Sequence, residues 1–324
     1  LDGWFRVADS HEIAKGQVKY LQNFDRSFAV FRGQDGYVRC VDAHCIHLGA
    51  NMAVGGKVVD NCLECPFHRW RYDGTGQCTH IPYQEKIPDA TKTKAYYVCE
   101  YYGMILLWIH SKDSAPSYYP PNIEKIDSGE MVPRGERHTA VNMHIVEFAE
   151  NSCDFQHFDP LHGRMAFPFT TKEIPGITVN HRPGWEEGKG DQSHLCWFLD
   201  DADLNLIGKH YPETAAQAVI TFVGPAGLVF FTFETPIGSI VLFQTHTPVA
   251  ELRLQVSFQW FASATMPRPL VWYIVGNWIG QWQNDISVWE NKIFMQRPVL
   301  VRNDGPMMKQ RRWWRQFTSS YTEL

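Results

Sequence analysis

Hydrophobic residues in the first third of the chain come in short runs that are separated by turn-forming residues. β-Branched and aromatic residues are frequent in the runs at 28–31 and 37–41, and Asp-Gly-Thr-Gly at 73–76 is a turn signal. Six consecutive apolar residues at 104–109 are typical of a final buried strand. Short strands alternating with turns predict an all-β module over residues 1 to about 110.

The rest of the chain follows a proline-rich stretch at 111–121, which is typical of a linker. Runs of β-branched and aromatic residues between about 175 and 262 predict an antiparallel sheet. The last long element is predicted as a helix from about 269 to 294. Large apolar residues recur on one face of that helix: Trp278, Trp282, Trp289 and Ile293. We therefore predict an α+β protein with two domains, residues 1–112 and 113–324.

Composition and charge narrow the class of protein. The chain is 44% hydrophobic and 20% charged, which is normal for a folded globular protein. Its net charge of −5 argues against nucleic acid as a partner, because phosphate binding needs a basic surface. No apolar run reaches the roughly 20 residues of a membrane-spanning helix, and no secretory signal is present. We expect an intracellular protein. The sequence starts at Leu1, and we expect the full-length protein to associate with the endoplasmic reticulum membrane through an N-terminal segment that is absent here.

Four candidate metal ligands lie in two short pairs. Cys45 and His47 form a C-x-H pair, and after 17 intervening residues Cys65 and His68 form a C-x-x-H pair. Zinc accepts two cysteines and two histidines, but a zinc finger offers both cysteines first and both histidines second. Here each pair offers one thiolate and one imidazole. This order favours a [2Fe–2S] cluster in which one iron binds both cysteines and the other binds both histidines.

These two pairs and the residues around them resemble the ligand loops of the Rieske family. The respiratory branch of that family has an additional cysteine in each loop, whereas this chain has Ala50 and Phe67 at those places. The resemblance is therefore to the oxygenase and ferredoxin branch. One departure is Arg69, where glycine is common. The resemblance implies that the cluster is held by four residues: Cys45, His47, Cys65 and His68.

A second group of polar residues follows the linker in the pattern N-x-x-D-x-x-H-x₄-H, made by Asn151, Asp154, His157 and His162. On one helix, Asp154 and His157 would share a face. His162 would lie off that face, but Pro160 is expected to loosen the helix near Asp159 and let His162 approach His157. Two histidines with one carboxylate form the ligand set of non-heme iron(II) oxygenases.

The carboxylate that completes this set must come from elsewhere in the chain. Asp285 lies within the aromatic face of the predicted C-terminal helix, between Trp282 and Trp289. A carboxylate on an apolar face is costly to bury unless it is paired or binds a metal. The rival is Glu290, which lies off that face. We predict Asp285 as the third ligand.

The cluster loops followed by this motif resemble the Rieske non-heme iron oxygenases. The resemblance implies a Rieske [2Fe–2S] domain and then a helix-grip (START-like) catalytic domain with an antiparallel sheet and a long C-terminal helix. It implies that O₂ reacts at a mononuclear Fe(II) held by His157, His162 and Asp285. It also implies a head-to-tail homotrimer, in which Asp154 bridges a cluster histidine of one subunit to an iron ligand of the next. A helix-start role is the alternative for Asp154, and Asn151 belongs to the motif without an assigned role.

Cofactor supply and substrate follow from the same resemblance. The chain has no glycine-rich dinucleotide motif, so electrons from NAD(P)H are expected through a separate reductase, with or without a ferredoxin. The aromatic residues of the predicted helix favour a large apolar substrate. Stretches at 3–8, 47–56, 73–83 and 284–292 resemble the Neverland-type cholesterol 7-desaturases, which implies conversion of cholesterol to 7-dehydrocholesterol. The alternatives are a steroid hydroxylase of the 3-ketosteroid 9α-hydroxylase type and a non-enzymatic lipid-binding module, which the complete ligand sets disfavour.

Overall fold

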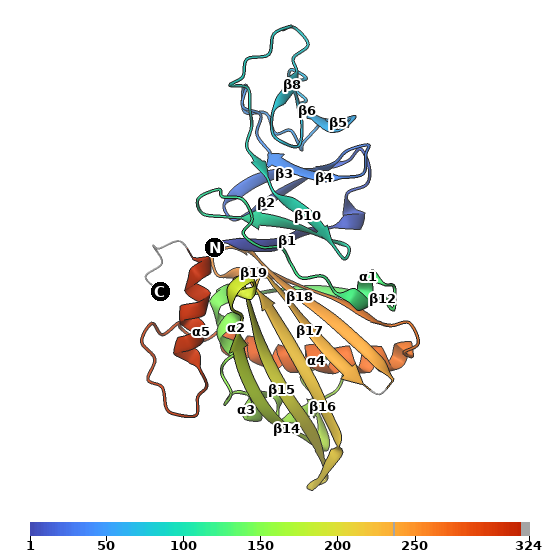
Figure 1. Ribbon diagram of the computed structural model, residues 1–324, viewed down its shortest axis with the longest axis vertical. Helices are drawn as coiled ribbons and strands as arrows, with labels where there is room; N and C mark the ends of the chain where they lie inside the picture. Colours follow the sequence, from blue (N-terminus) through green and yellow to red (C-terminus); the bar gives the residue numbers. More distant parts are fainter. Residues whose placement is uncertain (236, 319–324) are drawn as a thin grey trace. The chain divides into compact units, whose positions relative to one another are not determined.

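The computed structural model describes residues 1–235 and 237–318, which form two compact units. The first unit comprises Asp2–Ser117 and Thr247–Glu251, and the second comprises Leu1, Tyr118–His246 and the described residues from Leu252 onward. Figure 1 labels most of the strands and helices of both units along the chain. Among the described residues, no helix is both long and apolar enough to cross a membrane.

The first unit is built from short strands in three small sheets. One sheet has the order β1-β11-β10, the second β2-β3-β4-β9, and the third β5-β6-β7-β8. The strands are β1 (Gly3–Asp9), β2 (Val18–Asn23), β3 (Arg26–Arg32), β4 (Val38–Asp42), β5 (Lys57–Val59), β6 (Cys62–Glu64), β7 (Arg71–Tyr72), β8 (Cys78–His80), β9 (Ala95–Tyr96), β10 (Val98–Tyr101) and β11 (Met104–Ile109), with one 3₁₀ turn, η1 (Ser10–Glu12). The predicted all-β character of this region is confirmed.

The hydrophobic residues of β11 explain why this strand lies in the middle of its sheet. All six of its residues are buried, as the apolar run predicted. It pairs antiparallel with β1, where Trp4 faces Trp108, and with β10, where Cys99 faces Leu106. A strand that is apolar on both sides belongs in the middle of a sheet that is covered on both faces.

The second unit is an eight-stranded sheet with helices packed on it. The sheet order is β12-β19-β18-β17-β16-β15-β14-β13. Its strands are β12 (Met131–Val141), β13 (Arg164–Ala166), β14 (Glu173–Glu187), β15 (Leu195–Leu206), β16 (Lys209–Val223), β17 (Leu228–Thr235), β18 (Gly238–Ala250) and β19 (Arg253–Ser263). The helices are α1 (Glu124–Asp127), α2 (Ile145–Asn151), α3 (Phe158–His162), α4 (Arg268–Trp289) and α5 (Met307–Trp314), with 3₁₀ turns η2 (Gly190–Gln192) and η3 (Arg315–Phe317). The predicted antiparallel sheet and long C-terminal helix are confirmed.

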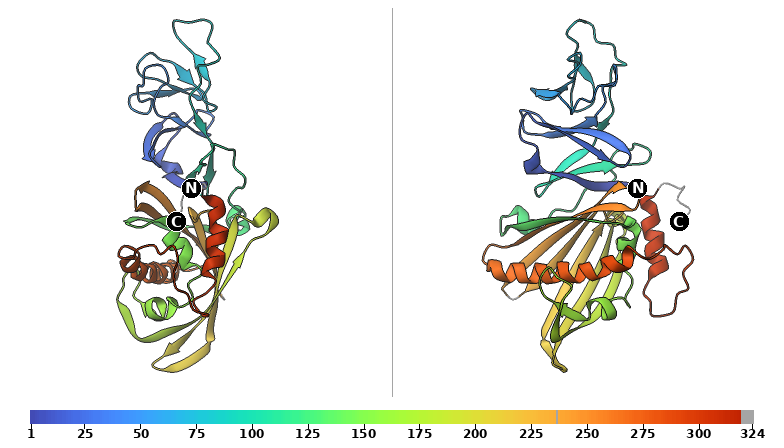
Figure 2. Two further views of the ribbon diagram at one scale, coloured as in Figure 1. Left: turned by 90° about the vertical axis from the view of Figure 1, so that its left-hand side faces the viewer. Right: turned by 180° about the vertical axis from the view of Figure 1, so that it is seen from behind.

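Helix α4 lies across one face of this sheet (Figure 2). It ends at Trp289, whereas the sequence predicted an end near 294. Trp289 is the last residue of the aromatic stripe that is buried, and Ile293 lies beyond the helix with 79% of its surface exposed. Asn291 caps the last turn by donating its side-chain N–H to the Ser287 carbonyl at 2.8 Å. Because Ile293 is exposed, packing against the sheet does not stabilise another helical turn beyond Trp289.

The segment from 145 to 162 corrects a second prediction. It is not one helix that loosens at Pro160. Helix α2 ends at Asn151, residues 152–157 form turns, and α3 begins at Phe158. Pro160 therefore lies in the first turn of α3, where its missing N–H has no helical partner in any case. The break that lets His162 turn toward His157 comes before α3.

Candidate metal centres and cavity

The two predicted cluster loops have the same backbone geometry. In each loop the cysteine carbonyl accepts a hydrogen bond from the N–H four residues later, Gly49 to Cys45 at 2.8 Å and Arg69 to Cys65 at 3.1 Å. The donor residue has a positive φ in both loops, 75° at Gly49 and 60° at Arg69. A positive φ favours glycine, which explains why arginine is unusual at this place. The loop nevertheless keeps its shape with Arg69.

The four predicted cluster ligands lie together at the end of the first unit. The ring centroids of His47 and His68 are 4.6 Å apart, and Trp70 stacks on His47 at 4.4 Å. The Nδ1 atom of His47 is buried and has no hydrogen-bond partner among the described residues. Cys45 and Cys65 are both buried. A buried ring nitrogen without a partner beside two buried thiols fits a metal cluster, because metal ligation satisfies all of these atoms.

The cysteine environment supports the same fit. Burial raises the pKa of the Cys65 thiol, and the nearby Cys45 sulfur raises it further. Two buried thiolates this close would repel one another, so a cation between them is needed to hold both in the ionised form. The Tyr72 hydroxyl lies 3.2 Å from Cys45 Sγ and is placed to donate a hydrogen bond to that sulfur.

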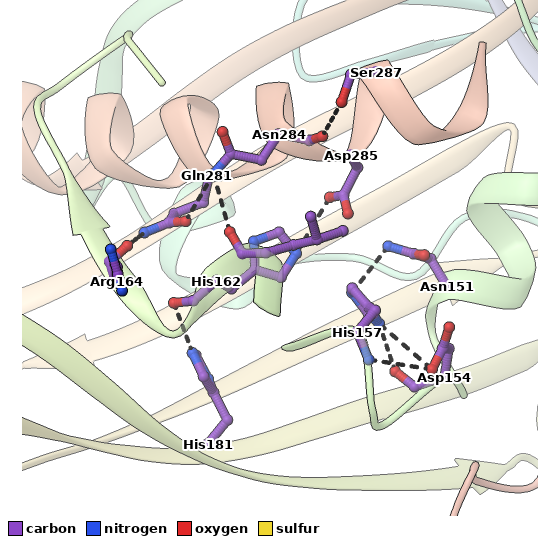
Figure 3. Close-up of polar contacts among 11 residues, drawn as sticks. Asn151, Asp154, His157, His162, Arg164, His181, Gln281, Asn284, Asp285 and Ser287 are labelled. Atoms are coloured by element: carbon purple, nitrogen blue, oxygen red, sulfur yellow. Dashed lines mark hydrogen bonds and ion pairs between the residues drawn. The ribbon is translucent and has the colours of Figure 1, made fainter. Parts of the chain in front are cut away.

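In the second unit, the structure brings His157, His162 and Asp285 together (Figure 3). His157 immediately precedes α3, His162 is its last residue, and Asp285 comes from α4, more than 120 positions later. Their candidate ligand atoms all lie within 4.8 Å of one another. The Nε2 atom of His162 is 3.3 Å from Asp285 Oδ2.

The buried polar atoms of this cluster fit a metal site. Asp285 is only 3% exposed, and its Oδ1 atom has no hydrogen-bond partner among the described residues. The Nδ1 atom of His162 is likewise buried without a partner. A buried carboxylate beside two imidazoles is costly unless a cation compensates its charge. The rival Glu290 is exposed, and its Oε1 accepts from the Asn142 backbone N–H at 2.8 Å.

The tautomer of His157 is set by its neighbours. Its Nδ1 lies 2.6 Å from the Asp154 carbonyl oxygen, which can only accept, so Nδ1 carries the proton. Its Nε2 therefore carries the lone pair, toward which Asn151 directs its amide nitrogen at 3.1 Å. Burial lowers the pKa of His157, which favours the neutral ring. A neutral imidazole with its second nitrogen bonded to a carbonyl is the usual form of a metal ligand.

Asp154 lies at the turn between α2 and α3. Its Oδ1 accepts from the backbone N–H groups of Gln156, at 3.1 Å, and His157, at 3.3 Å. These bonds stabilise the turn before α3, whose N-cap is His157, so Asp154 is a turn residue and does not itself start the helix. Its side chain is 38% exposed, so the carboxylate also faces solvent. Asn151, Asp154 and His157 thus form one short polar chain (Figure 3).

A cavity opens beside this cluster. His157, His162 and Asp285 lie in its wall, and most of the remaining lining is apolar. Six of the apolar lining residues come from the sheet and from α4: Phe198, Ile220, Phe222, Phe231, Trp278 and Trp282. The cavity therefore suits an apolar molecule next to the candidate metal ligands.

Comparison with known proteins agrees with this geometry. Residues 3–96 match the model of the Rieske [2Fe-2S] domain, and residues 107–318 match that of the 3-ketosteroid 9alpha-hydroxylase C-terminal domain. Cholesterol 7-desaturase nvd of Xenopus laevis is 37% identical over 98% of this chain and 72% of its own length. The chain belongs to the cholesterol 7-desaturase family of Rieske oxygenases. It is accordingly an oxidoreductase, and its N-terminal unit is a Rieske domain, which supports the predicted [2Fe–2S] cluster.

Two further comparisons concern a curated relative and a solved structure. The probable 3-ketosteroid-9-alpha-monooxygenase oxygenase component of Rhodococcus rhodochrous is 27% identical over 97% of the chain and 79% of its own length. The structure of NdmA from Pseudomonas putida CBB5 with caffeine superposes with a TM-score of 0.72, at 19% identity, over 96% of this chain and 89% of that one. The latter likeness confirms the predicted fold.

Several cavity residues were not predicted from the sequence. His181 of β14 lines the cavity, and its Nε2 lies 3.2 Å from the His162 carbonyl oxygen. Asn277 and Gln281 of α4 also line it. The sequence contained evidence for a polar stripe on this helix, because Asn277, Gln281 and Asn284 recur at helical spacing among aromatic residues. His181 had no local signal.

Proposed function

We propose that this chain desaturates cholesterol between C7 and C8 to give 7-dehydrocholesterol. The observation that carries the proposal is the apolar cavity that opens directly beside His157, His162 and Asp285. Most of the side chains that line it are aromatic or aliphatic, which suits the hydrocarbon skeleton of a sterol. Relatives named cholesterol 7-desaturase, which match nearly the whole chain, support this choice of substrate and reaction.

In this proposal a mononuclear ferrous ion is held by His157, His162 and Asp285. Two imidazoles and one carboxylate on one face leave positions open for other ligands. When bound, the iron supplies the activation of O₂. The protein contributes a neutral His157 held by the Asp154 carbonyl, and a cavity wall of aromatic and aliphatic side chains that excludes water from the substrate.

The electrons enter through the first unit, where Cys45, His47, Cys65 and His68 are the proposed ligands of the [2Fe–2S] cluster. NAD(P)H supplies them through a separate reductase, with or without a ferredoxin. The overall reaction balances: the sterol loses two hydrogen atoms, and O₂ takes these with two further electrons and two protons to give two water molecules. Because a sterol partitions into lipid, we also propose that the protein works at an intracellular membrane such as that of the endoplasmic reticulum.

The proposal is tested by reconstituted turnover. The chain, a compatible reductase, NADPH, O₂ and cholesterol are incubated, and the sterols are analysed by mass spectrometry and ultraviolet absorbance. We expect a product two mass units lighter than cholesterol, with the absorbance of a conjugated diene. A reaction without NADPH is the control. Absence of any product, in a preparation with a reducible cluster and bound iron, would contradict the cholesterol assignment.

A steroid hydroxylase is the second candidate. It is favoured by one observation, the match of residues 107–318 to the 3-ketosteroid 9alpha-hydroxylase C-terminal domain. The same three ligands would serve hydroxylation, so the site does not separate the two reactions. The product does, because hydroxylation adds sixteen mass units. The lower identity of the Rhodococcus relative, 27% against 37% for the Xenopus relative, makes this candidate the second choice.

We further propose that the enzyme is a head-to-tail homotrimer. Each chain exposes apolar side chains beside the cluster loops, namely Ile46, Leu48 and Phe67. It also exposes Ile293, Val299 and Val301 on the segment after α4. That segment is tied to the Asp154 turn, because the Asn303 carbonyl accepts from Gln156 Nε2 at 2.7 Å. Contact between these two surfaces of neighbouring chains would bury both and bring a cluster near the Asp154 of the next chain.

Mixed trimers test this arrangement. One chain carries Cys45→Ser and Cys65→Ser and lacks the cluster, while a second carries Asp285→Ala and lacks the mononuclear iron. Neither is expected to turn over alone. Oligomers that contain both, isolated through two different affinity tags, are expected to recover turnover, because the cluster of one chain serves the iron of its neighbour. Inactive mixed oligomers, despite intact remaining centres, would contradict the head-to-tail order.

A further inference from the structure

Three amide side chains form a polar stripe along α4. Asn277, Gln281 and Asn284 are spaced at i, i+4 and i+7, so they share one helix face. The stripe leads directly to Asp285, the proposed iron ligand on the same helix. These amides stand out because α4 is otherwise rich in aromatic residues on its buried side.

Each amide nitrogen donates to a backbone carbonyl of the segment that carries His162. Asn284 donates to Leu161 at 3.0 Å, and Gln281 donates to Arg164 (Figure 3). Asn277 donates to Ala166 at 2.6 Å. As the donors run forward along α4, the acceptors run backward along residues 161–166. The segment is thus fixed against the helix at three successive points.

This ladder takes the place of a neighbouring strand. β13 (Arg164–Ala166) is the last strand of the eight-stranded sheet, and among the described residues its only strand neighbour there is β14. The other edge of β13 faces α4, whose amides donate to the carbonyl groups of Arg164 and Ala166. The amides satisfy them. A strand of three residues makes few ladder bonds of its own, so its position depends on these side chains.

His181 holds the same segment from the side of the sheet. Its Nε2 lies 3.2 Å from the carbonyl oxygen of His162 itself. Its Nδ1 lies 2.6 Å from Asp200 Oδ2, a carboxylate of β15 that is 5% exposed. His181 is therefore oriented by a buried group of its own, and it connects His162 to strands β14 and β15.

We propose that the α4 amides and His181 are positioning residues that set the separation between His162 and Asp285. This inference rests on the proposed iron site. The two ligands come from elements more than 120 positions apart in the chain, and a metal site tolerates errors of only about 0.2 Å in its ligand distances. The amides fix the His162 segment along α4, and His181 fixes its distance from the sheet.

A pair of matched substitutions separates positioning from general stability. Gln281→Met keeps the size of the side chain and removes one amide-to-carbonyl bond of the ladder. Gln255→Met removes a bond of the same kind, from Gln255 Nε2 to the Thr139 carbonyl at 2.9 Å, far along the chain from the His162 segment. Fe(II) is titrated into protein whose mononuclear site has been emptied with a chelator, and the ferrous–nitric oxide signal is recorded by electron paramagnetic resonance.

We expect Gln281→Met to weaken Fe(II) binding by about 10- to 100-fold and to broaden the ferrous–nitric oxide signal. Gln255→Met is expected to leave both at the wild-type value. Cluster absorbance in the first unit and circular dichroism report on folding of each variant. Equal iron affinity in Gln281→Met and the wild type, or an equal loss in both variants, would overturn the inference.

A second pair tests His181 by rescue. The amide nitrogen of glutamine can occupy the place of His181 Nε2, whereas that of asparagine reaches only the place of Nδ1. His181→Gln is therefore expected to bind Fe(II) within a few-fold of the wild type, and His181→Asn to lose about 10- to 100-fold. Equal affinity in the two variants would overturn the role of His181. A wild-type chain that takes up no mononuclear iron would overturn the proposed iron site and this inference together.

Discussion

Replacing Asp285 by alanine is expected to abolish sterol turnover while leaving the cluster intact. Asp285 supplies the only carboxylate among the three side chains that the structure brings together at the cavity. Loss of a group that merely orients a metal ligand costs about 10- to 100-fold, so loss of a ligand is expected to cost more than about 100-fold in iron affinity. Iron analysis is expected to fall from three atoms per chain to two, those of the cluster.

The fold is expected to survive this substitution. Asp285 Oδ1 has no hydrogen-bond partner among the described residues, so its removal breaks few bonds and relieves the burial of a charge. Glu290→Ala is the matched control, because this carboxylate lies five positions later and is exposed. It is expected to keep both iron and turnover. Full turnover in Asp285→Ala, or loss of iron in Glu290→Ala instead, would refute the assignment of the third ligand.

The parts of the fold that the sequence predicted well depend on neighbours in the chain. The buried strand at 104–109 was evident because six apolar residues in a row fit only a covered strand. The two cluster loops were evident because their ligands lie two or three residues apart, and the loop hydrogen bonds span four residues. The sequence therefore predicts a structural feature well when the residues that form it lie within a few positions of one another.

The segment around Asp154 was predicted less well, because a motif gives spacing but not backbone conformation. Proline before His162 suggested a break near Asp159, yet the chain breaks earlier and uses Pro160 in the first turn of α3. Asp154 favours that earlier break, since its side chain accepts from two backbone N–H groups of the turn. The end of α4 was overestimated for a similar reason, because burial against the sheet, not spacing alone, determines where it stops.

The cavity could not be predicted, because its wall comes from distant strands. Phe198, Ile220 and Phe231 belong to three neighbouring strands. In the sequence, each of them is indistinguishable from an ordinary core residue. His181 contacts the His162 carbonyl only because β14 pairs with the short β13. Asp285 was predicted as a ligand because a charge within an aromatic helix face has a local energetic signal, whereas a histidine within a strand does not.

The structure also separates two roles that Asp154 could have. Its Oδ1 stabilises the turn, and its half-exposed carboxylate faces outward, where a neighbouring chain of the proposed trimer would bring a cluster histidine. The residue is linked to the iron side through its own carbonyl, which accepts from His157 Nδ1. A substitution that keeps the turn but removes the charge can therefore isolate the bridging role.

Asp154→Asn is such a substitution, and we expect it to reduce turnover by about 10- to 100-fold with both metal centres fully occupied. Asparagine accepts hydrogen bonds from a turn as aspartate does, so the fold and the His157 tautomer are expected to persist. The loss is expected in electron transfer. The reduced enzyme with substrate bound is mixed with O₂ in a stopped-flow instrument, and the return of the oxidised cluster absorbance is expected to slow by the same factor as turnover. Asp159→Asn, which changes an exposed carboxylate in the first turn of α3, is the control and is expected to behave as the wild type. If Asp154→Asn reoxidises at the wild-type rate, Asp154 acts as a cap of the turn and not as the bridge between subunits.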